Sequence, residues 1–371
     1  MAESTRGILK TEGKRGGVLR DPIKLLRPKS DDVRVPQNLI QKFGLCDGAD
    51  VIGPVRGSGR NLELADVETI CGLKPEDFKF RTPYKDLTAI DPDDRFHLAS
   101  GGNLSMRVVD LIAPIGKGTR SLVVSPPKAG KTTLLEQIAN AIYAEQPQTR
   151  IIVLLVDERP EEVTTFRRAV KAEVFASSND QTVAEHVELT ELTLAHIRTE
   201  LECGRDVVVL LDSLTRMGRA FNLGGGGNGH RGTMSGGLAA GALEVPRRFF
   251  GMARNVEHGG SVTIVGTCLV DTGSRMDQII FEEFKGTGNS EIILDRSLSE
   301  ARIWPAIDIA ASGTRKEERL YSPEEFPHLV AMRRGLAGLK PREAIDTLLR
   351  LISRHPTNEE FLASIPVKVE R

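Results

Sequence analysis

The chain has 371 residues, of which 27% are charged, and its 50 Lys and Arg nearly balance 51 Asp and Glu. This length suits one large domain and a small one, and the formal net charge of −1 leaves any nucleic-acid contact to local basic patches. No apolar run is long enough to cross a bilayer, and Met1–Lys10 lacks the apolar core of a signal peptide. We therefore expect a cytoplasmic protein with no membrane partner. Its 4 cysteines lack the spacing of a zinc site and are expected to be free thiols.

Residues 1–95 differ in character from the rest and are expected to form a separate N-terminal domain. The first forty are basic, and we expect the first twenty to be disordered. Residues 36–44 have the pattern of a short helix that opens on a proline. Residues 49–55 and 62–67 alternate like the strands of a small barrel or hairpin sheet, with a glycine-rich turn between them and a linker-like stretch at 99–103.

Residues 96–371 are expected to form an α/β domain, because short apolar strands alternate with helices from about residue 104 onward. The expected strands cover 122–125, 151–156, 207–211 and 262–267. The expected helices cover 131–146, 160–171, 181–204, 236–253, 341–353 and 358–365. Such alternation is typical of a largely parallel sheet.

The run Ser125–Thr133, Ser-Pro-Pro-Lys-Ala-Gly-Lys-Thr-Thr, directly follows the first of these strands. A strand that leads through such a loop into a helix turns backbone N–H groups toward phosphates. Lys131 would then reach the terminal phosphates, and the Thr132 hydroxyl would bind Mg²⁺. The run departs from the usual pattern at Ser125, where a glycine is expected. The candidate nucleotide-binding residues of the loop are Ala129, Gly130, Lys131, Thr132 and Thr133.

Two other apolar strands end in carboxylates, Glu158 and Asp212. The carboxyl ends of strands carry the active sites of α/β sheets, so Glu158 can orient and deprotonate an attacking water. Asp212 can hold the hydration shell of Mg²⁺ near the phosphate loop. The alternatives are structural: the acids around Pro160 would only favour a helix N-terminus, and Asp212 would only cap a helix.

Two polar loops follow strands of the large domain. Residues 222–237 are too glycine-rich to pack, and they carry Arg231, Thr233 and Ser235. This segment is either a disordered surface loop or a mobile loop that touches a polyanion backbone. The second loop, 271–277, carries a single cation, Arg275.

Several longer runs occur in the order in which one family of RecA-like ATPases has them. They are Pro126–Thr132, Val156–Val163, Leu211–Arg216, Arg248–Asn255, Phe281–Asn289 and Ser312–Glu318. On these runs the chain resembles the bacterial transcription termination factor Rho family, and residues 7–45 resemble it more weakly. The resemblance implies a RecA-like P-loop ATPase domain preceded by a small OB or cold-shock-like barrel. It further implies a homohexameric ring that uses ATP and Mg²⁺ to move 5′→3′ along single-stranded RNA and dislodge RNA polymerase.

The resemblance also implies roles for individual residues. Lys128 and Lys131 would contact phosphates, Glu158 would activate water, and Trp304, which composition alone would place in the core, would lie against the adenine. Arg315 would be an arginine finger that reaches a neighbour's γ-phosphate. The other residues implied to border the nucleotide are Gly116, Lys117, Gly118, Thr119, Arg120, Ser121, Arg159, Arg216 and Arg302. The loops of Arg231 and Arg275, with Lys285 nearby, would line the central pore and hold RNA.

The N-terminal domain departs from the family at its base-stacking residues. The family's glycine-aromatic strand corresponds to Gly16–Arg20 here, and Arg34 and Asn61 stand where tyrosines are expected. Base–aromatic stacking is worth about 1–3 kcal/mol per base, so we expect RNA to load weakly, through salt-dependent backbone contacts.

Three other functions remain open from the sequence. A rotary or secretion ATPase would share the phosphate loop and the strand-end carboxylates but act on a protein partner. A non-catalytic RNA-binding ring would keep the fold, although the set of Lys131, Thr132, Glu158, Asp212 and Arg315 argues against lost catalysis. A DNA recombinase fits least well with an N-terminal barrel.

Overall fold

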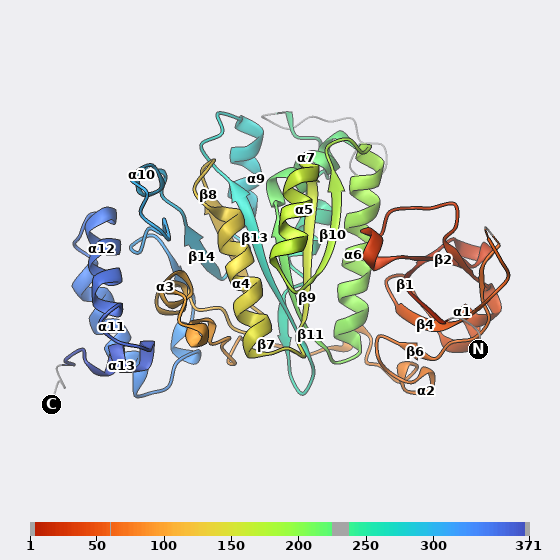
Figure 1. Ribbon diagram of the computed structural model, residues 1–371, viewed down its shortest axis with the longest axis horizontal. Coiled ribbons are helices and arrows are strands. Elements are labelled where there is room, and N and C mark those ends of the chain that lie inside the picture. Colours follow the sequence, from red (N-terminus) through yellow and green to blue (C-terminus); the bar gives the residue numbers. More distant parts are fainter. Residues whose placement is uncertain (1–3, 60, 225–236, 368–371) are drawn as a thin grey trace.

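The computed structural model describes residues 4–59, 61–224 and 237–367. In its N-terminal part, five strands close a small barrel, since β1 pairs with both β2 and β4 and the ring runs β1-β2-β3-β5-β4 (Figure 1). A sixth strand extends from β4. The elements are β1 (Ser4–Thr11), β2 (Gly17–Arg20), β3 (Val33–Val35), α1 (Gln37–Phe43), β4 (Asp50–Arg56), β5 (Glu63–Leu64), β6 (Thr69–Ile70) and α2 (Pro75–Phe78).

The expected disorder of the first twenty residues is wrong, because most of them form β1 and β2. Their apolar side chains drive this order: Ile8, Leu9 and Leu19 are at most 4% exposed. The basic side chains of the same strands face outward or form ion pairs. The expected helix at 36–44 is confirmed as α1, and the expected strand at 49–55 is confirmed as β4.

The large domain is built on a mainly parallel sheet of order β10-β9-β11-β13-β8-β14-β15, in which β13 lies between β8 and β11. Two short strands extend this sheet at the amino end of β13. β12 pairs antiparallel with β13 there, and β7 pairs antiparallel with β12. The strands are β7 (Ala89–Ile90), β8 (Arg120–Ser125), β9 (Arg150–Glu158), β10 (Glu173–Ser178), β11 (Asp206–Asp212), β12 (Arg254–Val256), β13 (Ser261–Leu269), β14 (Ser290–Ile293) and β15 (Gly313–Thr314).

Helices cover both faces of this sheet, and the strands alternate between two cores. Along β9, Ile151, Val153 and Leu155 pack on the side of α4 and α5, whereas Ile152 and Leu154 pack on the side of α6 and α7. Figure 1 shows α4 and α5 crossing one face. The helices are α3 (Leu104–Ile112), α4 (Lys131–Glu145), α5 (Pro160–Ala169), α6 (Val183–Glu202), α7 (Leu214–Leu223), α8 (Glu244–Phe250), α9 (Arg275–Lys285), α10 (Arg296–Glu300), α11 (Glu325–Leu336), α12 (Pro341–Ile352) and α13 (Asn358–Ala363).

The four expected strands of the large domain are confirmed as β8, β9, β11 and β13, but two expected segments are wrong. The helix expected over 236–253 is limited to α8, because Gly237 and Gly241 have φ of 80° and 82° and turn the chain before it. The linker-like 99–103 is a 3₁₀ turn, after which the Asn103 side chain caps α3 by accepting from the Met106 N–H at 3.2 Å. Throughout the described parts of the chain, no helix combines the length and apolar character needed to cross a membrane.

A partly buried ionic cluster, in which Asp50 and Glu200 are the buried members, joins the barrel to the large domain. Arg6 and Asp50 come from barrel strands, and Arg150, Glu173 and Glu200 come from β9, β10 and α6. Arg150 lies 3.1 Å from Asp50, 3.3 Å from Glu173 and 3.5 Å from Glu200. Separating one partner from such a cluster would leave an uncompensated charge. The cluster therefore stabilises this arrangement of the barrel against α6.

Candidate active site

The carboxyl ends of β8, β9 and β11 bring the predicted phosphate and metal residues together. Lys131 Nζ donates to Asp212 Oδ2 at 2.5 Å, and Thr132 Oγ1 donates to the same oxygen at 3.4 Å. The Thr132 hydroxyl and Asp212 therefore converge on one point beside the lysine. Such hard oxygen donors, few in number, suit Mg²⁺, which keeps most of its waters. The residues present thus fit a Mg²⁺–nucleotide.

The phosphate loop has the backbone that close approach to phosphates requires. Lys128 and Gly130 have φ of 65° and 87°, and Gly130 precedes the first residue of the 15-residue helix α4. A Cβ on Gly130 would lie 2.6 Å from the Trp304 ring, so only glycine fits there. The N-terminus of α4 faces the loop with its unpaired N–H groups, which favours anions.

Glu158 is 3% exposed at the end of β9, and the side chain of Arg216 binds it. Arg216 donates to Glu158 Oε1 at 3.0 Å and to the backbone oxygen of Asp157 at 2.7 Å. Burial raises the pKa of Glu158 to about 7, with a further increase from Asp212, whereas Arg216 and Lys131 act in the opposite direction. Within the described residues, its other oxygen, Oε2, has no hydrogen-bond partner. A carboxylate with this pKa and an available oxygen is suited to accept a proton from water near neutral pH.

A cavity of about 290 Å³ opens beside the phosphate loop. Trp304 is 45% exposed and forms one wall, so it is not a core residue. The walls are mostly apolar, and they are formed by Ala129, Gly130, Thr133, Leu134, Trp304 and Pro305 among others. A slot of this kind next to a phosphate site accepts a flat aromatic base.

The predicted segment 116–121 leads into β8 and includes its first two residues, so it lies at the end of that strand away from the phosphate loop. Its residues are Gly116, Lys117, Gly118, Thr119, Arg120 and Ser121. Since each strand residue advances about 3.3 Å, the segment is roughly 15 Å from the loop. There Lys117 lies 2.8 Å from Asp94 and 3.1 Å from Asp206, which opens β11. The segment therefore lies at the opposite end of β8 from the phosphate loop of its own chain, and its expected contact with a nucleotide stays a prediction.

Arg315 lies at the same end of the sheet, where the parallel strands have their amino ends. In the antiparallel pair of β14 and β15, Thr314 stands opposite Ser290, and Ser290 pairs with Ser121 at the start of β8. Arg315 is exposed just after this pair. Arg315 therefore lies beside the amino end of β8, at the opposite end of that strand from the phosphate loop of its own chain.

The remaining predicted arginines differ in their surroundings. Arg216 belongs to the site through Glu158. Arg159 borders it, but its side chain is 64% exposed, and its ion pair with Glu162 is 3.8 Å long. Arg302 is exposed two residues before Trp304, with a φ of 59°.

The predicted RNA-contacting residues are only partly described. Arg231, Thr233 and Ser235 lie outside the described residues. Arg275 is not in a loop but opens α9, where the Ser274 side chain accepts from the Asp277 N–H at 3.3 Å. Lys285 closes the same 11-residue helix, so the two cations are roughly 15 Å apart rather than adjacent.

The sequence did not single out Thr267, at the end of β13. Its hydroxyl donates to Asp212 Oδ1 at 2.8 Å and so fixes the carboxylate that faces Lys131. The available signal was a polar residue near the carboxyl end of an apolar strand, since β13 lies between β8 and β11.

Models of two known protein domains match the two parts of this chain. Residues 5–76 match the RNA-binding domain of the Rho termination factor, and residues 105–314 match the nucleotide-binding domain of the ATP synthase alpha/beta family. The chain is 46% identical over 361 residues to transcription termination factor Rho of Akkermansia muciniphila, covering 96% of this chain and 76% of that protein. It is also 46% identical over 368 residues to Rho of Aquifex aeolicus, covering 97% of this chain and 84% of that protein.

The chain belongs to the transcription termination factor Rho family. This membership supports an ATP-hydrolysing enzyme that acts in transcription termination. Some members are longer: the chain is 47% identical to Rho of Mycobacterium bovis but spans 58% of that protein's length. Among solved structures, the assembled ATPase EscN of an enteropathogenic E. coli type III secretion system has a TM-score of 0.59 at 21% identity, over 75% of this chain and 72% of that one. That likeness shows a shared fold.

The barrel of this Rho-family chain carries a basic groove of about 370 Å³. Its lining includes four cations, two acids and no aromatic side chain: Arg15, Arg20, Lys29, Arg34, Glu12 and Asp32. Arg20 is held by Asp32 at 2.5 Å and by Glu188 of α6 at 3.0 Å. Among the described residues, the lining of this groove thus presents cations without an aromatic stacking surface, in line with the substitutions at Gly16–Arg20 and Arg34.

Proposed function

We propose that the chain is the subunit of a homohexameric ring that hydrolyses ATP to move 5′→3′ along single-stranded RNA and release it from RNA polymerase. The observation that carries this proposal is the joint occurrence, on one chain, of a Lys131–Asp212–Glu158 site and an RNA-binding-type barrel with a basic groove. The site supplies hydrolysis, and the groove supplies a first hold on the RNA.

In this proposal each residue acts at a defined point of the reaction. Lys128 and Lys131 bind phosphates, Trp304 holds the base, and Thr132 with Asp212 holds Mg²⁺, which neutralises charge on the phosphates when bound. Glu158 accepts the proton of the attacking water through Oε2 while Arg216 orients its Oε1.

Arg315 completes the site of a neighbouring subunit. An arginine that stabilises the charge of a transferring phosphoryl group is worth about 10³–10⁵ in rate. Because Arg315 lies at the opposite edge of the sheet from Lys131, a single subunit is expected to hydrolyse ATP slowly, and ring assembly is needed for full activity.

RNA is expected to enter through the barrel groove and then reach Arg275 and the glycine-rich segment that carries Arg231. Without stacking residues, the groove should bind through phosphates, so its affinity should fall steeply with salt. Little preference among bases is expected, because phosphate contacts carry no sequence information.

The test is ATP hydrolysis by the purified chain with no nucleic acid, oligo-C, oligo-U or single-stranded DNA, each at low and high salt. We expect strong stimulation by both RNAs, little preference for C, and a loss of stimulation as salt rises. Hydrolysis that ignores RNA would contradict the translocase and favour an ATPase with a protein partner.

A further inference from the structure

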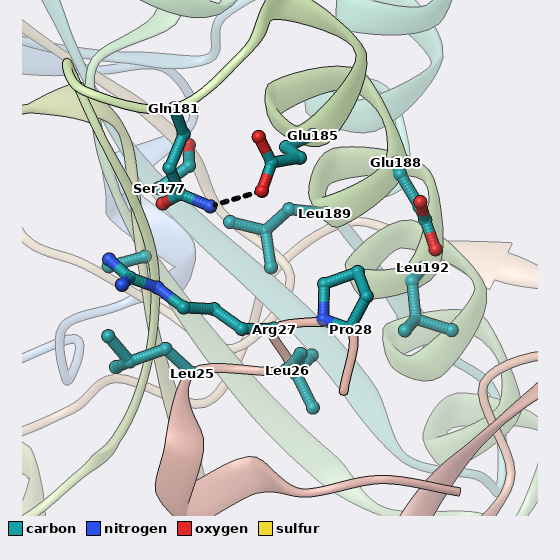
Figure 2. A pocket seen from close by; sticks show the side chains of 11 residues that line it. Leu25, Leu26, Arg27, Pro28, Ser177, Gln181, Glu185, Glu188, Leu189 and Leu192 are labelled. Carbon is teal, nitrogen blue, oxygen red and sulfur yellow. Dashed lines mark hydrogen bonds between the residues drawn. The ribbon is translucent and has the colours of Figure 1, made fainter. Parts of the chain in front are cut away.

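A short segment of the barrel reaches out to the large domain on the side of α6. Residues 21–28, which we call the strap, connect β2 to β3 and pack against β10 and α6 (Figure 2). The cavity beneath the strap measures about 20 Å³, which is enough for a water molecule and too small for a ligand. The strap is therefore a packed contact between the two domains and not a binding pocket.

The strap adopts an unusual backbone to make this contact. The Asp21 side chain accepts from the Ile23 N–H at 2.9 Å, and Leu25 and Leu26 follow with φ of 63° and 58°. Left-handed conformations in consecutive non-glycine residues cost roughly 1–3 kcal/mol each and persist only where the surroundings impose them. Here Leu26 is 4% exposed, so the strain is held by burial against the large domain.

Two hydrogen bonds fix the strap to the large domain, one from each side of the interface. Arg27 donates from Nη2 to Ser178 Oγ at 2.9 Å. In the other direction, Arg167 donates to the backbone oxygen of Ile23 at 3.1 Å. In Figure 2, the Arg27 side chain extends to the side of the pocket on which Ser177 and Gln181 lie.

Both contacts fall on the elements that flank Glu158. Ser178 is the strand partner of Glu158 in the β9–β10 pair, and the next residue, Asn179, donates its N–H to the Glu158 backbone oxygen at 3.0 Å. Arg167 belongs to α5, which begins two residues after Glu158. The strap thus contacts β10 directly at the strand partner of Glu158, and it contacts α5 near the far end of that helix.

The other end of the strap begins in the barrel groove. Arg20, the residue before the strap, lines that groove and pairs with Asp32 and Glu188. A displacement of Arg20 by a bound polyanion would therefore act on a segment that ends on the neighbours of Glu158.

We propose that Arg27 is a positioning residue for Glu158, and that the strap ties the placement of this carboxylate to the seating of the barrel. The inference rests on the proposed function only in taking Glu158 as the group that activates water. No contact between Arg27 and the nucleotide is needed, because Arg27 acts through Ser178 and Asn179.

The experiment compares Arg27→Ala, Arg27→Lys, Ser178→Ala and the double variant Arg27→Ala/Ser178→Ala in the full chain, with Lys24→Ala as control. Lys24 is exposed on the same strap, and its ion pair within the described residues is with Asp21, so its removal takes away one charge without touching the large domain. Measured quantities are kcat and KM for ATP with and without RNA, RNA affinity, and the unfolding temperature.

For Arg27→Ala we expect kcat to fall about 10-fold, with KM for ATP and RNA affinity within twofold of the parent, since small displacements of a reacting group cost this much. Arg27→Lys should recover part of kcat. The double variant should be no slower than Arg27→Ala, because both changes remove one contact.

The proposal is overturned by an unchanged kcat, by an equal loss in Lys24→Ala, or by losses that multiply in the double variant. A loss confined to unfolding temperature would also overturn it, since it would show a purely structural contact. A parent protein whose hydrolysis ignores RNA contradicts the proposed function instead, and kcat without RNA then still decides the role of Arg27.

Discussion

At the scale of single residues, the environment of Glu158 is expected to set the pH dependence of ATP hydrolysis. Its pKa of about 7 arises mainly from burial, and the positive charge of Arg216 keeps it from being higher. A base must be unprotonated to act, so kcat/KM for ATP should rise as pH increases through about 7 and level off above it, reporting the free enzyme.

The variant Arg216→Gln should move this acid limb to higher pH, because it removes a cation that favours the charged carboxylate. Arg168→Gln, an exposed change in the last turn of α5, should leave the limb in place. The measurement is kcat/KM from pH 5.5 to 9 for the three proteins. A limb that stays at the same pH in Arg216→Gln would show that another group controls it.

The residues of the candidate site were predictable where a local pattern marks them. Lys131 and Thr132 follow a strand in a phosphate-loop run, and Glu158 and Asp212 end apolar strands, so spacing alone suggested that they meet. The separation of Gly116–Ser121 from the phosphate loop could also be read from the sequence, because the segment precedes the strand that the loop follows. Its expected contact with the nucleotide came from the family resemblance alone, and no local pattern supports it.

At the scale of elements, the contact between the barrel and α6 depends on Gly48. Its φ is 82°, and a Cβ there would lie 2.2 Å from the backbone of Ala195 and His196. The Gly48 oxygen also lies 2.8 Å from Nδ1 of the buried His196. No rotamer change relieves a clash with backbone, so the barrel would have to move away from the helix.

Gly48→Ala should therefore lower the free energy of unfolding by about 3 kcal/mol or more, as overpacking and backbone strain add. Gly13→Ala is the matched control, because its φ is 64° and a Cβ there meets nothing within 4 Å. It should cost only about 1 kcal/mol, the strain alone. Urea unfolding measures the free energy of unfolding of both variants. Equal losses in the two would show that the close approach of Gly48 to α6 does not contribute to stability.

The elements themselves were predictable where apolar periodicity was long and uninterrupted, as in β9 and α6. The failures share a cause, which is that tertiary contacts override local composition. Basic composition suggested disorder before residue 20, yet a few fully buried apolar side chains are enough to order β1 and β2. Residues 271–277 suggested a loop, yet the Ser274 cap starts α9 at Arg275.

At the scale of the whole molecule, the two halves of the proposed catalytic site lie at opposite ends of the parallel strands of one sheet. Lys131 follows the carboxyl end of β8, and Arg315 stands beside its amino end. Head-to-tail subunits in a closed ring would place one edge against the other, so each interface would combine the phosphate loop of one subunit with Arg315 of the next.

This arrangement can be tested by mixing two inactive proteins. Lys131→Ala removes the phosphate contact of its own site, and Arg315→Ala removes the finger from its neighbour's site. In rings assembled from equal amounts of both, about a quarter of interfaces pair an intact phosphate loop with an intact Arg315, by random order around a heterologous ring. RNA-stimulated hydrolysis should reappear when the two variant proteins are unfolded, mixed and assembled together. It should stay absent when rings of each variant are assembled separately and then mixed. If Arg315 acted within its own chain, no mixture would recover, because every subunit would carry one broken half of its site.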